Sequence, residues 1–232
     1  MPSKKTKNQK PKSNKFSKRN SGSQVVLYPL IIFALIVWVL YRSLFHFPVW
    51  FDESIGKAIF FGLPVWLYIS GSGNREVVRT FDFDQIRPGM LLGLAVGGLY
   101  GFVAAIAVLF ARSSGVMSVA LFSSTLFWWE FLLALLTGFW ESLFFFSFIM
   151  TGVLAKHQSW SVLKQVMWVA LIFLIFHLPN TILRFSGLNI LTEIFLLYFF
   201  ALGQAFVFYK RRNFYTLVIS QAIWGMVLLV HV

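Results

Sequence analysis

The sequence predicts an all-α fold, a polytopic bundle of about seven helices that cross a membrane. Of its 232 residues, 58% are hydrophobic and 12% are charged, whereas soluble domains average about 45–50% apolar and 25% charged residues. The hydrophobic residues form long uninterrupted runs, which are typical of membrane helices and not of the alternating strands of a membrane barrel. Cysteine is absent, which excludes disulfides, thiolate metal sites, a cysteine nucleophile and palmitoylation.

The N-terminal segment, residues 1–24, predicts a disordered basic tail. It carries eight Lys and Arg residues and no acidic residue, so it cannot bury enough apolar surface to offset the entropy of ordering. Such a tail can bind nucleic acid or anionic lipid headgroups, or can set the topology of the chain. Because the tail directly precedes a hydrophobic run, we favour the topological role, expect contact with anionic lipids, and expect no nucleic-acid partner.

Seven hydrophobic segments follow the tail. Most approach the roughly 20 residues that span a bilayer, and the fourth is about twice as long, with Thr137-Gly138 near its middle as a point where the helix could break. The segments lie at residues 25–41, 54–70, 89–111, 117–155, 160–179, 189–209 and 214–230.

The distribution of basic residues indicates a cytoplasmic N-terminus and a C-terminus outside. An odd number of crossings over residues 117–155 leaves only four cations outside, namely Arg42, Lys57, Arg112 and Arg184. Two full crossings there would place Lys210-Arg211-Arg212 outside, against the positive-inside rule. We therefore predict either one long tilted helix or a partly re-entrant first half followed by one crossing.

A stripe of small residues runs along the third segment. Gly89, Gly93, Gly97 and Gly101 recur every four residues, and Ala105 continues the row. Such a stripe allows close approach of another helix in lipid. It is consistent with a homodimer face, but we favour packing within the bundle.

Six polar or ionisable residues inside the hydrophobic segments are candidates for a functional role, because a charged side chain there is costly and usually has a partner or a task. Two of them, Glu130 and Glu141, share a helix face about 16 Å apart, which is too far for an acid/base pair on a continuous helix. Another, Glu193, is expected to be partly solvated near Arg184. The six are Glu130, Glu141, His177, Glu193, Gln204 and Gln221.

Glu141 and His177 are predicted to lie at one depth. Counted from Lys156 and Lys164 along antiparallel helices, each is about 20 Å from the cytoplasmic boundary. A carboxylate and an imidazole that share a buried water can activate it for attack on a carbonyl; alternatively, the pair only fixes helix packing. Two ligands fall short of the three protein ligands of a catalytic zinc site, so we expect no metal and no cofactor.

Two motifs resemble those of a known family. Residues 139–149 (FWESLFFFSFI) are similar to the Glu-Glu-x-x-x-Arg helix of the CAAX-protease and bacteriocin-processing (CPBP) family of intramembrane endopeptidases. Residues 171–180 (LIFLIFHLPN) resemble its second motif, Phe-x-x-x-His. The resemblance covers residues 117–230. It implies a CPBP-like core bundle at residues 117–232, preceded by further transmembrane helices at residues 25–116.

The sequence also departs from the family pattern. With Glu141 on the first Glu, the second Glu is replaced by Ser142 and the Arg by Phe146. In the last helix, the expected His and Asn fall on Gln221 and Gly225.

The resemblance implies a role for each of three residues. Glu141 would be the general base, His177 would position the water, and Gln221 would be an oxyanion donor. The third motif, in which both expected residues are replaced, is the weakened part of the site. Loss of one oxyanion donor typically costs about 100- to 1000-fold in rate.

The resemblance leads us to expect an enzyme. It would be an intramembrane glutamate-type endopeptidase that hydrolyses a peptide bond of a membrane-associated protein or peptide, in a bacterial cytoplasmic membrane. The alternative is a catalytically inactive relative that serves as an adaptor or binding scaffold. A transporter or channel is less consistent with the sequence, because the few intramembrane polar groups do not outline a path.

Overall fold

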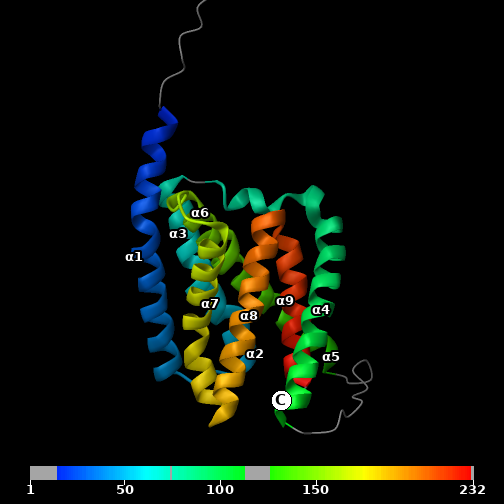
Figure 1. Ribbon diagram of the computed structural model, residues 1–232. Helices are drawn as coiled ribbons and strands as arrows, with labels where there is room; N and C mark the ends of the chain where they lie inside the picture. Colours follow the sequence, from blue (N-terminus) through cyan, green and yellow to red (C-terminus); the bar gives the residue numbers. More distant parts are fainter. Residues whose placement is uncertain (1–14, 74, 113–125, 231–232) are drawn as a thin grey trace, which may run out of the picture.

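The computed structural model describes residues 15–73, 75–112 and 126–230, and every regular element in this part of the chain is helical (Figure 1). The main helices are α1 (Lys15–Leu44), α2 (Val49–Phe51), α3 (Leu63–Ser72), α4 (Ile86–Arg112), α5 (Phe127–Glu141), α6 (Thr151–Lys156), α7 (Val162–Arg184), α8 (Leu188–Arg211) and α9 (Phe214–Val230). The π-helical segments are η1 (Asp52–Gly56), η2 (Ala58–Gly62) and η6 (Ser142–Met150), and the 3-10 turns are η3 (Val78–Phe81) and η4 (Phe83–Gln85).

Six helical segments are long and apolar enough to cross a membrane, and α9 is a shorter apolar helix. This finding confirms the predicted all-α bundle and indicates an integral membrane protein. The six segments are Val25–Leu44, Val49–Ser72, Phe83–Ile106, Phe127–Lys156, Val162–Arg184 and Leu188–Arg211.

The bundle has two ends of different charge. Helix α1 begins at one end, shown at the top of Figure 1, and α9 finishes at the other. We call the first the basic end, because eight cations lie in the connections that meet there and in the helix turns that adjoin them. These are Arg75, Arg79, Arg87, Lys156, Lys164, Lys210, Arg211 and Arg212.

Two helix boundaries differ from those expected. Helix α1 begins at Lys15, inside the predicted disordered tail, because extending an existing helix by one residue costs far less than nucleating a new one; residues 1–14 lie outside the described part. The fourth segment is helical without a break from Phe127 to Lys156, one residue beyond the expected end, and forms one candidate span; residues 117–125 of the expected segment lie outside the described part. Gly138 does not break it: a Cβ there would lie 2.8 Å from the Val218 carbonyl oxygen, so this glycine serves close contact with α9.

The small-residue stripe of α4 packs inside the bundle. A Cβ on Gly93 would lie 2.8 Å from Cβ of Ile219, and one on Gly97 would lie 2.9 Å from Cα of Ser220. Both neighbours belong to α9. The stripe is thus a contact between α4 and α9, as favoured, and not a surface left open for a second copy.

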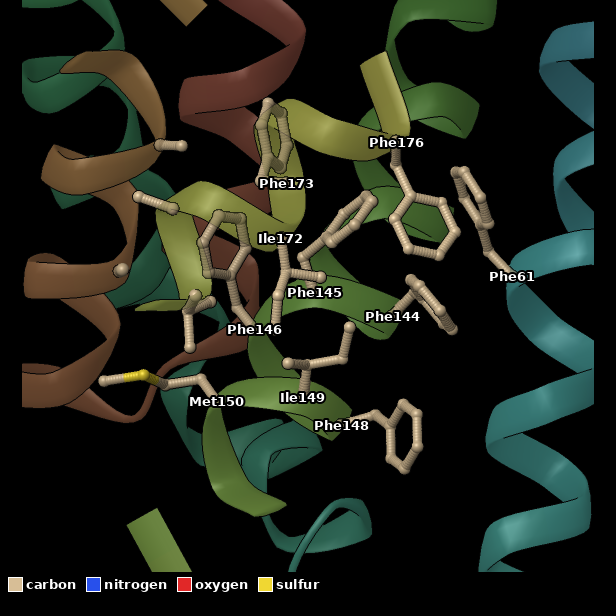
Figure 2. Packing of buried hydrophobic residues seen from close by; sticks show 14 of the residues in the cluster. Phe61, Phe144, Phe145, Phe146, Phe148, Ile149, Met150, Ile172, Phe173 and Phe176 are labelled. Atoms are coloured by element: carbon tan, nitrogen blue, oxygen red, sulfur yellow. The ribbon is translucent and has the colours of Figure 1, made fainter. Parts of the chain in front are cut away.

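The core is built around the π-helix η6. Four phenylalanines of η6 are fully buried, and Figure 2 shows them packed against Phe61 and against Phe173 and Phe176 of α7. A helix that is hydrophobic on all sides belongs in a protein core or in a membrane, and here neighbouring helices cover η6. Of the six candidate spans, Phe127–Lys156 has the largest buried share, 61% of the residues in its 18-residue apolar stretch. This span holds Glu141 at the centre of the bundle.

Candidate functional site

Three elements bring the predicted site residues together. Glu141 ends α5, His177 lies on α7 and Gln221 lies on α9. His177 Nε2 is 3.4 Å from Glu141 Oε2, and Gln221 Nε2 donates a hydrogen bond to the same oxygen. Glu141 and Gln221 are each only 4% exposed. Glu141 and His177, which the sequence predicts at one depth, are thus neighbours in the bundle.

A buried cation, Lys57, joins this cluster. Its Nζ donates to Glu141 Oε1 at 2.5 Å and also bonds Glu53, and Lys57 is 5% exposed. Thr137 Oγ1 donates to Glu53 Oε2 at 2.5 Å. Buried charges persist only when they are paired and hydrogen-bonded, so Glu53, Lys57 and Glu141 form one network.

The position of Lys57 differs from the prediction, which placed this residue outside the membrane. The segment that contains it begins at Val49, earlier than expected, so Lys57 lies inside a helical span and not at its outer end. Its spacing of four residues from Glu53 is the signal that could have indicated pairing, because opposite charges at that spacing meet on a helix.

The orientation of the His177 ring is set by its own helix. Its Nδ1 lies 2.8 Å from the Phe173 carbonyl oxygen, and the ring stacks on that of Phe173 with 4.0 Å between centroids. A carbonyl oxygen only accepts, so Nδ1 carries a proton. In the neutral ring, the lone pair of Nε2 then faces Glu141.

π-Helical turns flank the charged residues. η6 begins immediately after Glu141, and Lys57 lies between η1 and η2. Such turns insert an extra residue into a helix and are frequent at functional sites. The first residue of η6, Ser142, is fully buried and donates to Gln221 Oε1 at 3.3 Å. Gln221 therefore bonds both the last residue of α5 and the first residue of η6.

The cluster lines a cavity of about 580 Å³, which is within the usual range for ligand sites. Its walls are largely apolar and aromatic, with the polar cluster at the inner end. The polar and ionisable lining residues are Glu53, Lys57, Glu130, Thr137, Glu141, His177, Asn180, Thr181, Arg184, Glu193 and Gln221.

Other residues singled out from the sequence have different positions. Glu130 and Glu193 line the cavity away from the cluster, whereas Gln204 donates to Ser220 Oγ at 2.7 Å and links α8 to α9. Phe146, at the position of the family arginine, is fully buried beside Phe173, and Gly225 lines the cavity. Within the described residues, no group of three or more His, Cys, Asp or Glu side chains is arranged to hold a metal ion.

The geometry defines a class, an integral membrane helix bundle with a buried Glu-Lys-His-Gln cluster at the inner end of a cavity. A comparison with protein-family models, curated proteins and solved structures finds no match for this chain.

Proposed function

We propose that the protein is an intramembrane endopeptidase of the glutamate type, similar in plan to the CPBP family. The observation that carries the proposal is the 3.4 Å approach of His177 to Glu141 beside a cavity of ligand size. A water that lies beside this pair, off the line that joins the two atoms, can approach both the carboxylate oxygen and the imidazole nitrogen.

The reaction uses the free positions of this cluster. A carboxylate oxygen has two lone pairs; one on Glu141 Oε2 accepts from Gln221, and the other is available to a water that also donates to His177 Nε2. Glu141 takes a proton as the water oxygen bonds the peptide carbonyl carbon, and later gives it to the leaving amine as the C–N bond breaks.

The developing oxyanion needs a hydrogen-bond donor. The Gln221 amide has two N–H groups, of which one bonds Glu141. The second N–H is the oxyanion donor in this proposal. It stands in for the His of the family's third motif.

A second function, a non-catalytic membrane adaptor or binding scaffold, is favoured by a different feature of the cluster. Lys57 and Gln221 each occupy one oxygen of Glu141, so the carboxylate already links the segment before α3 to α5 and α9. Such a network contributes to a unique packing arrangement without any chemistry.

The two functions are separated by Glu141→Gln. This variant retains shape and leaves Lys57 paired with Glu53, so the fold should persist while cleavage falls by at least about 100-fold, the usual contribution of a general base. The matched control is Glu193→Gln, a cavity residue outside the cluster. The readout is a comparison of new peptide termini in membranes of cells that express the wild-type protein or each variant, with thermal unfolding in detergent as the folding check.

Each outcome decides between the functions. Loss of the same termini in Glu141→Gln and their persistence in Glu193→Gln support the peptidase. Unchanged cleavage by a folded Glu141→Gln protein removes Glu141 from the chemistry. Intact cellular function in that variant, with no cleavage by the wild type, favours the scaffold.

A further inference from the structure

We propose that the cavity opens to the extracytoplasmic side and receives an apolar peptide segment from there. The direction of opening follows from the structure and the charge distribution alone. The identity of the ligand as a peptide substrate rests on the proposed function.

The cavity extends from the bundle centre to the end opposite the basic end. Its outer wall comes from α2, from the first turn of α5 and from the last turn of α7, and all three lie at that end (Figure 1). Trp50 and Trp129 in this wall are 47% and 50% exposed, whereas Glu141 at the inner end is 4% exposed. This gradient of exposure locates the mouth at the end where α1 finishes.

The charges of the two ends indicate which side the mouth faces. The basic end holds eight cations in the described connections and in the helix turns that adjoin them, namely Arg75, Arg79, Arg87, Lys156, Lys164, Lys210, Arg211 and Arg212. In the described part of the chain, the opposite end holds three cations, namely Arg42, which is paired with Asp52, Arg112 at the last residue of α4, and Arg184 at the mouth. Positively charged connections remain in the cytoplasm, so the mouth faces outward.

The lining of the cavity indicates the chemistry of its ligand. Trp50, Trp129, Phe185 and Trp224 provide apolar and aromatic walls, which suit apolar side chains. Asn180 also lines the cavity, and its buried Oδ1 has no hydrogen-bond partner among the described residues. A buried acceptor of this kind requires a donor.

Asn180 lies three residues after His177 on α7, on nearly the same helix face. A backbone N–H of a bound peptide would supply the missing donor beside the proposed water. The ligand class is therefore an extended apolar peptide, such as the outer end of a membrane-spanning segment.

The absence of cysteine from the sequence permits a direct test with single-cysteine variants in intact cells. Trp50→Cys and Trp129→Cys place a thiol at the mouth, Asn180→Cys places one inside the cavity, and Gln158→Cys, an exposed site between α6 and α7, is the matched control at the basic end. The probe is a membrane-impermeant maleimide, applied before and after permeabilisation. Size-exclusion profiles in detergent establish that each variant is folded.

We expect the two mouth variants and Asn180→Cys to react in intact cells, and Gln158→Cys to react at least tenfold faster after permeabilisation. Labelling of Gln158→Cys alone in intact cells, or equal labelling at both ends, would overturn the assignment of sides. Reaction at the mouth without reaction of a folded Asn180→Cys protein would overturn access to the inner end. These results are independent of cleavage, so they stand or fall separately from the peptidase.

The ligand class has its own test. The new termini produced by the wild-type protein should map to extracytoplasmic ends of apolar segments. Termini in cytoplasmic loops would contradict the proposed route of entry, even if Glu141→Gln abolishes them.

Discussion

At the scale of single residues, Lys57 has the greatest effect on the electrostatics of the site. It is the buried cation between the carboxylates of Glu53 and Glu141. Without it, two negative charges would remain in a region of low dielectric constant, where isolated charges are strongly unfavourable. Lys57 is thus the paired cation for both carboxylates in the part of the cluster next to His177.

Lys57→Met should lower the free energy of unfolding by about 3–5 kcal/mol, the usual effect of removing one partner of a buried ion pair. The measurement is unfolding in mixed detergent micelles. The control is Lys164→Met at an exposed position, with an expected change within about 0.5 kcal/mol.

The double variant Lys57→Met/Glu141→Gln removes charges of both signs and should recover part of the loss. Equal destabilisation in the single and double variants would show that the pairing contributes little and that Lys57 acts by packing alone.

Part of this site, the proximity of Glu141 and His177, could be predicted from the sequence. The positions of Glu141 and His177 could be compared from their distances to basic residues, because the rise per residue of a helix is constant. The pairing of Lys57 with Glu141 could not be predicted in this way, because the depth of a residue in the membrane does not determine the direction of its side chain. The rotation of one helix against another depends on packing of all helices together, as with the four fully buried phenylalanines of η6.

At the scale of helices, the contact between α4 and α9 depends on glycine. A Cβ on Gly97 would lie 2.8 Å from Cδ1 of Ile223, whereas nothing lies within 4 Å of a Cβ on the next residue, Gly98. The two neighbouring glycines therefore offer the same substitution at a packed and at an open position of one helix.

Gly97→Val should destabilise the bundle by about 1–3 kcal/mol, the usual cost of overpacking, because it pushes α4 away from α9. Gly98→Val should have little effect beyond helix propensity. The measurement is thermal unfolding of both variants in the same detergent. Similar unfolding temperatures for the two would contradict close α4–α9 packing.

The connection between α6 and α7 is held against α1 by His157. Its Nε2 lies 2.6 Å from the Tyr28 hydroxyl, and its ring stacks on Trp160. Burial lowers the pKa of His157, and the neighbouring Lys156 and Lys164 lower this pKa further. The neutral ring is therefore the form that the folded protein favours.

This shift predicts a pH dependence of stability. The folded pKa lies below the unfolded value of about 6.5, so the unfolded chain binds more protons as the pH falls below that value. Stability is then lost as the pH falls from about 6.5 through the folded pKa. Unfolding temperatures across this range should fall less in His157→Gln, which does not titrate. An identical decline in the wild type and the variant would assign the effect to other groups.

At the scale of the whole molecule, the topology depends on α9, which carries Gln221 to the cluster. Its 17 residues span about 25 Å at 1.5 Å per residue, which is shorter than the roughly 30 Å hydrocarbon core. A short segment can still cross, because local thinning of the bilayer accommodates it at modest cost. The six longer spans return the chain to the basic end at Arg212 (Figure 1). A seventh crossing is therefore required for a C-terminus outside.

Alkaline phosphatase fusions test this crossing, because the enzyme needs disulfides that form only after export. A fusion after Val232 should be active, and a fusion after Asn213, which lacks α9, should be inactive at equal abundance on immunoblots. Activity of neither fusion would mean that α9 does not cross. Activity of the Asn213 fusion alone would place the basic end outside, and the cavity mouth would then face the cytoplasm.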